Sequence, residues 1–168
     1  MFNWYKKVVF ENYVNFNGRA RRSEFWYFIL MNMIFSIALM VIDKLLSLST
    51  GFTSFKIIQN IYSLLLFLPG LAVAVRRLHD VGKSGWWMLV FYLVIAVSAG
   101  GVAAIWFSSL QSPGSIFTNV WFYVLLLVAL GSSIWMMVLN CIAGEQGANK
   151  YGSDPKLHGE EINEIGTA

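Results

Sequence analysis

Residues that could bind a ligand are concentrated in three short polar segments, 17–24, 76–87 and 144–155, which long apolar stretches separate. Arginine forks bind phosphate oxygens through paired hydrogen bonds. Lysines and arginines beside cytoplasmic helix ends attract anionic lipid by about 1 kcal/mol per residue. The residue types therefore favour a headgroup site, in which the bases form a cradle that His79 and Asp80 orient. The candidate binding residues are Arg21, Arg22, Arg76, Arg77, His79, Asp80, Lys83, Asn149 and Asp154.

The same segments leave an enzymatic interpretation open. His79 with Asp80, or Asp154, is the type of group that binds a metal or serves as acid and base on a phosphorylated lipid. Metal sites in proteins usually need three or four protein ligands, and His158 supplies the only other imidazole. We therefore expect no metal, no cofactor and no catalytic residue.

A structural interpretation also stays open. Arginines at the ends of membrane spans can simply fix topology, and the acidic residues Glu24, Asp80 and Asp154 could pair with them. Such pairs would hold the C-terminal tail against the segment 76–85. A turn over 149–155 would then pack on that segment, because its Asn, Gly, Asp and Pro residues favour turns.

The elements that carry these segments are predicted from composition. The chain has 168 residues, of which 57% are hydrophobic and 12% charged, too apolar a composition for a small water-soluble domain. Four apolar runs, at about 25–42, 57–75, 86–107 and 120–143, are long enough to cross a bilayer, which takes ~20 helical residues. Hydrocarbon offers the backbone no hydrogen-bond partner, so each run should be helical.

We predict an all-α polytopic membrane protein, a bundle of four transmembrane helices with a cytoplasmic cap made from the polar segments. Residues 1–158 should form one domain that includes the N-terminal segment 1–24, and 159–168 should form a mobile tail. In the N-terminal segment, Phe2, Tyr5, Val9 and Tyr13 recur at helical spacing. This pattern fits a short helix that lies in the plane of the membrane interface.

Orientation is predicted from the basic residues beside each span. With four spans, ten of the twelve bases lie on the side of both termini, and only Lys44 and Lys56 lie on the other. Because basic residues are enriched on the cytoplasmic side, both termini should be cytoplasmic. The ten are Lys6, Lys7, Arg19, Arg21, Arg22, Arg76, Arg77, Lys83, Lys150 and Lys156.

Three separated motifs carry a family resemblance. They read Asn17-Gly-Arg-x-x-Arg-Ser-Glu-Phe-Trp26, then Arg76-Arg-Leu-His-Asp-x-Gly-x-Ser-Gly-Trp-Trp87, then Gly147-x-Asn-x-Tyr-Gly-x-Asp-Pro155. Their order and spacing resemble domain-of-unknown-function family 805 from roughly Tyr5 to Pro155. The resemblance implies a small bacterial inner-membrane protein and supplies no activity, substrate or catalytic residue.

These observations predict a non-catalytic bacterial inner-membrane protein that binds anionic lipid headgroups, or a membrane-protein partner, through its cytoplasmic cap. A homo-oligomer is compatible with this interpretation, and nucleic-acid binding is not expected because the bases flank membrane spans. One alternative is a small transporter or channel component that acts as an oligomer. The apolar runs contain no Asp, Glu, Lys, Arg or His, which argues against proton coupling. Another alternative is a membrane enzyme that acts on a phosphorylated lipid.

Overall fold

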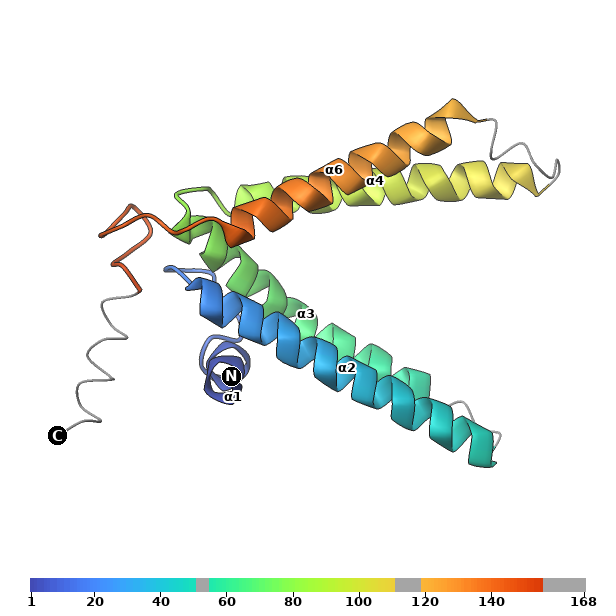
Figure 1. The fold of residues 1–168 in the computed structure, drawn as a ribbon, viewed down its shortest axis with the longest axis horizontal. Helices are drawn as coiled ribbons and strands as arrows, with labels where there is room; N and C mark the ends of the chain where they lie inside the picture. Colours follow the sequence, from blue (N-terminus) through green and yellow to red (C-terminus); the bar gives the residue numbers. More distant parts are fainter. Residues whose placement is uncertain (51–54, 111–118, 156–168) are drawn as a thin grey trace. The chain divides into compact units, whose positions relative to one another are not determined.

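The computed structural model describes residues 1–50, 55–110 and 119–155, and its regular elements are helices (Figure 1). Four of them are long and apolar enough to cross a membrane, which confirms the predicted all-α fold with four spans. The predicted mobile tail, 159–168, and His158 lie outside the described residues. The elements in chain order are α1 (Phe2–Lys6), the π-helical turn η1 (Lys7–Glu11), α2 (Arg22–Thr50), α3 (Phe55–Asp80), α4 (Trp86–Ser109) and α6 (Val120–Cys141).

The helices do not end where the apolar runs end. Helix α2 begins at Arg22, before the predicted start of its run at Phe25, and α3 continues past Val75 to Asp80. Helical hydrogen bonds form in water as well as in hydrocarbon, so hydropathy marks membrane depth and not helix length. The connection to α4, predicted from position 76, is therefore only 81–85, and the second polar segment begins within the last turns of α3.

The chain divides into two compact units, and each is described separately. One comprises Met1–Gly82 together with the chain from Ala143 onward, and the other comprises Lys83–Ile142. In the second unit α4 and α6 pack as a helical hairpin. The rings of Trp87 and Trp135 meet edge to face at 5.0 Å. A Cβ atom at Gly101 would lie 2.6 Å from Leu125 Cδ1, so a larger residue there would have to displace the end of the Leu125 side chain.

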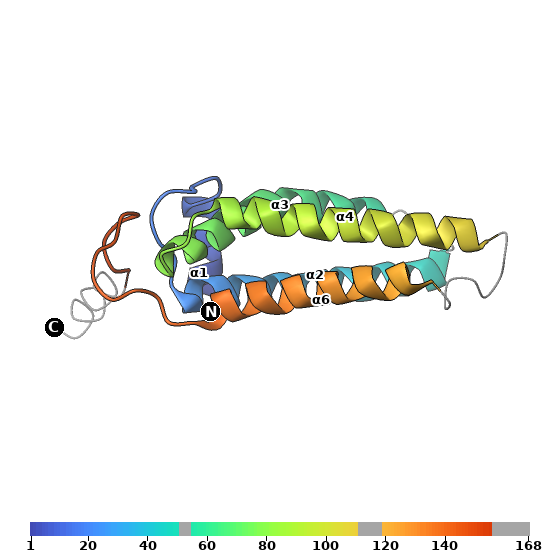
Figure 2. The ribbon, with the colours of Figure 1, turned by 90° about the horizontal axis from the view of Figure 1, so that it is seen from above.

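In the first unit, α1 and η1 lie across the hairpin of α2 and α3. Figure 1 shows α1 nearly end-on, and Figure 2 shows it running from α3 to α2. The ring of Tyr5 stacks on Phe28 at 5.8 Å and contacts Phe35 at 5.5 Å. The hydroxyl group of Tyr13 donates to the carbonyl of Leu65 at 2.5 Å. These contacts fix the N-terminal helix against two spans.

The long helices leave most of their apolar surface uncovered. In the most apolar window of α2, α4 and α6 only 11% of the residues are buried inside the protein, and in α3 only 22%. A soluble protein seldom exposes such continuous apolar surface, whereas lipid chains solvate it. The buried residues of the first unit instead gather at one end of the α2/α3 hairpin, where charged side chains are among the least exposed.

Candidate functional site

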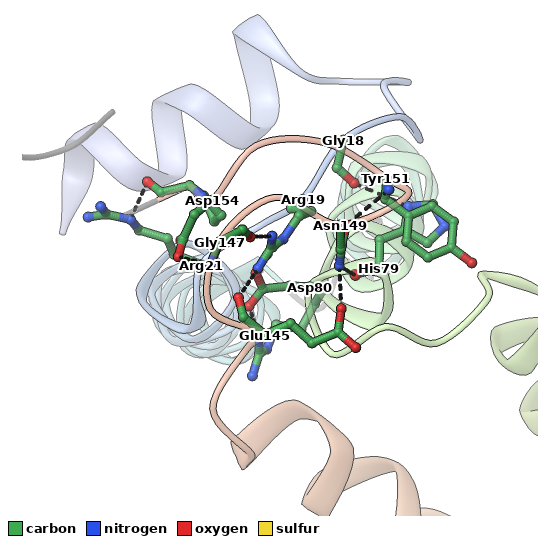
Figure 3. Close-up of polar contacts among 12 residues, drawn as sticks. Gly18, Arg19, Arg21, His79, Asp80, Glu145, Gly147, Asn149, Tyr151 and Asp154 are labelled. Carbon is green, nitrogen blue, oxygen red and sulfur yellow. Dashed lines mark hydrogen bonds and ion pairs between the residues drawn. The ribbon is translucent and has the colours of Figure 1, made fainter. Parts of the chain in front are cut away.

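The polar cluster is centred on Asp80, the last residue of α3 (Figure 3). Its carboxylate is buried, and Oδ1 accepts a hydrogen bond from Nε of Arg19 at 3.0 Å. Nη2 of the same guanidinium group lies 2.9 Å from Oδ1 in an ion pair. Its other oxygen, Oδ2, is paired with Nη1 of Arg77, whose side chain is completely buried. Ionised donors and acceptors form the stronger protein hydrogen bonds, so this carboxylate holds two guanidinium groups in fixed positions.

Arg19 also holds the segment that follows α6. Its Nη1 donates to the carbonyl of Gly147 at 2.5 Å, and its Nη2 donates to the carbonyl of Glu145. The amide of Glu145 in turn donates to the backbone carbonyl of Asp80 at 2.8 Å. One guanidinium group therefore joins the chain before α2, the end of α3 and the chain after α6.

Asn149 makes a second attachment between this segment and α3. Its Nδ2 donates to the carbonyl of His79 at 3.0 Å and to Oε2 of Glu145 at 2.9 Å. Asn149 and Gly152 exchange two backbone hydrogen bonds of 3.0 Å, which close a tight turn. The turn that the sequence predicted over 149–155 is present, and it packs against the end of α3.

His79 lies between this turn and the chain before α2. Its ring stacks on the ring of Tyr151, with centroids 3.9 Å apart and planes 6° from parallel. Its Nδ1 lies 3.1 Å from the carbonyl of Gly18. A carbonyl oxygen only accepts hydrogen bonds, so Nδ1 carries the proton in this contact. The imidazole therefore serves as a packed connector between two segments.

A second ion pair lies beside the first. Nη1 of Arg76 donates to Oε1 of Glu24 at 2.6 Å, and both side chains are buried. The carbonyl of Arg76 accepts from the amide of Ala20 at 3.0 Å, which ties the chain before α2 to α3. The remaining guanidinium nitrogens of Arg76, Nε and Nη2, are buried and have no hydrogen-bond acceptor among the described residues. This pair therefore depends on a single carboxylate contact.

Two further contacts hold the end of the segment. Oδ2 of Asp154, a buried residue, accepts from the amide of Gly147 at 3.2 Å. Nε of Arg21 donates to the carbonyl of Pro155 at 2.6 Å. Both ends of the stretch from Gly147 to Pro155 are thus attached within the cluster.

Two glycines make the close approach possible. A Cβ atom at Gly144 would collide with the carboxylate of Asp80, and one at Gly82 would collide with the carboxylate of Glu145. Gly82 also has a φ of +70°, a conformation that side chains with a Cβ atom rarely adopt. The turn after α3 and the chain after α6 therefore need glycine at these positions in order to meet.

The structure separates the predicted site residues into three groups. Arg76, Arg77, His79, Asp80 and Asn149 lie inside the cluster, Arg21 and Asp154 hold the end of the tail segment, and Arg22 and Lys83 are exposed. The prediction that Asp80 and Glu24 pair with arginines is confirmed.

Arg19, the residue with the largest number of cluster contacts described above, was missing from the predicted site. It belongs to the first sequence motif, but the other arginines of that motif carry the same charge. Only the fold distinguishes it, since its side chain is 1% exposed whereas Arg22 is an exposed residue.

The buried charges of the cluster balance. Within the described residues the buried charged side chains are three arginines and three carboxylic acids, namely Arg19, Arg76, Arg77, Glu24, Asp80 and Asp154. A buried charge is tolerated when it is paired and hydrogen-bonded, so this composition suits a region of low polarity. The described part of the chain contains no group of three or more His, Cys, Asp and Glu residues that could hold a metal ion.

Comparisons with known proteins agree with the motif resemblance. The family model for proteins of unknown function DUF805 matches residues 13–153. The chain is 38% identical over 155 residues to the inner membrane protein YhaH of Escherichia coli strain K12, covering 92% of this chain and 98% of the relative. It is 35% identical over 154 residues to the inner membrane protein YhaI of that strain, covering 92% and 96%.

A third relative in strain K12, the uncharacterized protein YiiR, is 31% identical over 148 residues, covering 83% of this chain and 85% of the relative. No solved structure matches the chain. The family match begins after α1 and η1, and it includes the first two polar motifs and most of the third. With its four candidate spans and its named relatives, the chain belongs to the DUF805 family and is a multi-pass protein of the inner membrane.

Proposed function

We propose that this protein is a non-catalytic inner-membrane protein that binds anionic lipid headgroups through the exposed bases around its polar cluster. The supporting observation is the division of the bases into two groups. Arg19, Arg76 and Arg77 are buried in ion pairs with carboxylates, whereas Arg22 is exposed at the first residue of α2. In this proposal the buried group forms a scaffold and the exposed group contacts lipid.

Electrostatics supports this division. An exposed base near an anionic leaflet gains about 1 kcal/mol from the surface potential. A buried arginine already donates to a carboxylate, and the opposite charge at contact distance cancels most of its field. A phosphate group that recruited Arg77 would have to displace Asp80. Arg22 is exposed and Arg21 is half-buried, so a headgroup can approach both from the solvent side.

The proposed orientation places both termini in the cytoplasm. Arg19, which precedes α2, hydrogen-bonds to Glu145 and Gly147, which follow α6, and these contacts support an orientation with both flanking segments on the same side. The ten-to-two distribution of bases favours the cytoplasm for that side. A membrane-protein partner, a homo-oligomer and a transport role stay predictions from the sequence.

Lipid retention measured by native mass spectrometry tests the proposal. Arg22→Gln is compared with Lys44→Gln, because both bases are exposed on α2 and lie about 33 Å apart along its axis. With the protein extracted in mild detergent and titrated with phosphatidylglycerol, Arg22→Gln should weaken lipid binding about fivefold, the equivalent of about 1 kcal/mol. Lys44→Gln should leave it unchanged.

Substituting Arg22 should not destabilise the fold, so weaker lipid binding would not result from unfolding. Arg22 lies at the positive end of the α2 dipole, so removing its charge relieves a repulsion. Thermal unfolding of both variants, followed by circular dichroism, should match that of the unaltered protein. Equal phosphatidylglycerol binding by Arg22→Gln and the unaltered protein, or an equal loss in Lys44→Gln, would overturn the proposal.

A further inference from the structure

The N-terminal helix has a surface that the polar cluster does not use. Elements α1 and η1 form a continuous helical stretch, Phe2–Glu11, which lies across α2 and α3 (Figure 2). On its inner side Val8 is completely buried, and Tyr5 is held between Phe28 and Phe35. This side fixes the helix to the spans and determines which residues face outward.

The outer side carries a row of two phenylalanines with a lysine between them. Phe2, Lys6 and Phe10 recur every four residues, which places them along one side of a helix. Phe2 is 62% exposed and Phe10 is 74% exposed, and Lys6 is exposed as well. In water this row would leave two phenyl rings in contact with solvent.

The position of the helix along α2 indicates what covers the row. Tyr5 contacts α2 midway between Phe28 and Phe35, roughly 14 Å along the helix from Arg22 at 1.5 Å per residue. The headgroup layer is about 5–7 Å thick on each side of the hydrocarbon. With Arg22 at the outer edge of that layer, the helix lies about 7 Å inside the acyl boundary. Interfacial helices bury their apolar side by about 5–10 Å, so the two depths agree.

We propose that Phe2–Glu11 is an interfacial anchor whose outer row, Phe2, Lys6 and Phe10, inserts into the leaflet on the side of the polar cluster. The two rings enter the acyl boundary, and the long stem of Lys6 allows its ammonium group to reach the phosphate layer. Helix α2 also presents exposed apolar side chains, among them Met33, so a lipid environment is already needed beside the N-terminal helix. This surface differs from the proposed headgroup site, and its insertion does not require anionic lipid.

Spin-label depth measurements test the anchor in vesicles of phosphatidylcholine alone. The single cysteine is first removed by Cys141→Ser, and single cysteines are then introduced by Phe2→Cys, Phe10→Cys or Gln146→Cys. Labels at the two phenylalanine positions should be accessible to oxygen and protected from a water-soluble nickel complex, at a depth of about 5–10 Å. The label at Gln146, an exposed residue of the tail segment, should show aqueous accessibility.

The unlabelled thiol of Val8→Cys reports whether the helix stays docked, since this position is completely buried and its thiol should resist a water-soluble thiol reagent. Nickel accessibility at Phe2 and Phe10 equal to that at Gln146 would overturn the proposal, as would a Val8→Cys thiol that reacts as fast as the Gln146→Cys thiol. The vesicles contain no anionic lipid, so this result and the phosphatidylglycerol titration of Arg22→Gln can fail independently.

Discussion

Arg19→Ala should release the segment after α6 while leaving the helices intact. The stretch 143–155 buries no large hydrophobic side chain, and Asp154 is its only buried residue. Its attachment to the cluster therefore depends on polar contacts and on the stacking of Tyr151 against His79. Arg19 supplies two of the polar contacts directly, through the carbonyls of Glu145 and Gly147, and it also holds the carboxylate of Asp80.

The magnitude follows from the hydrogen bonds that are lost. A hydrogen bond to a charged group contributes about 1.5–3 kcal/mol, so the two bonds from Arg19 to the segment contribute about 3–6 kcal/mol. The lower end applies here, because the segment is largely exposed and water can replace the lost donors. A loss of about 3 kcal/mol corresponds to a roughly 100-fold increase in the population of the released segment.

Hydrogen exchange followed by mass spectrometry measures this population. The amide of Glu145 donates to Asp80 and the amide of Gly147 donates to Asp154, so both should be protected in the unaltered protein. Peptides covering 143–155 should lose protection by roughly 100-fold in Arg19→Ala, whereas peptides from α2 and α3 should change little.

Arg22→Ala is the matched control, because it removes the same side chain from an exposed position three residues away. Exposed substitutions usually change stability by less than about 0.5 kcal/mol, so exchange in the segment should change less than about threefold. If Arg19→Ala changed the exchange no more than Arg22→Ala does, the assignment of Arg19 as the residue that holds the segment would be wrong.

Two other substitutions test the remaining contacts. Glu24→Leu should lower the free energy of unfolding in detergent by about 3–5 kcal/mol, because it leaves Arg76 buried without a counterion. Adding Arg76→Leu should restore most of this loss. Equal stability of the single and double variants would contradict this prediction. Gly144→Ala should displace the carboxylate of Asp80 and lower the melting temperature. Gly100→Ala should leave the melting temperature unchanged, because the added Cβ atom would meet no described atom within 4 Å. Equal melting temperatures of these two variants would exclude the proposed clash.

The four spans could be predicted because bilayer thickness and the absence of hydrogen-bond partners in hydrocarbon leave few alternatives to apolar helices. The starts of α4 and α6 could also be predicted, whereas the start of α2 and the end of α3 could not. Helix α2 starts at Arg22 and α3 ends at Asp80, both beyond the apolar runs. These extra turns are held by backbone hydrogen bonds and by side-chain pairs such as Arg76 with Glu24, which hydropathy does not register.

The sequence could predict which segments form the candidate site, but not which residue of a segment makes each contact. Arg19, Arg21 and Arg22 stand within four positions and are chemically identical. The turn at Gly18, with a φ of +82°, and the start of α2 at Arg22 decide which guanidinium group reaches Asp80. Such a choice depends on backbone direction over a few residues, which motif spacing alone does not encode.

The burial of three arginines also shows that a base can influence membrane topology without contributing much to the electrostatic field of the folded surface. During insertion every base of the unfolded chain can bias topology, because none is yet paired. After folding, Arg19, Arg76 and Arg77 are matched by buried carboxylates and contribute little to the field at the surface. If the termini are cytoplasmic as proposed, removing one of the ten bases would leave nine against two, enough to preserve orientation. Substituting a base of the buried cluster should therefore change the tail segment without changing the topology. Substituting an exposed base should instead alter lipid binding.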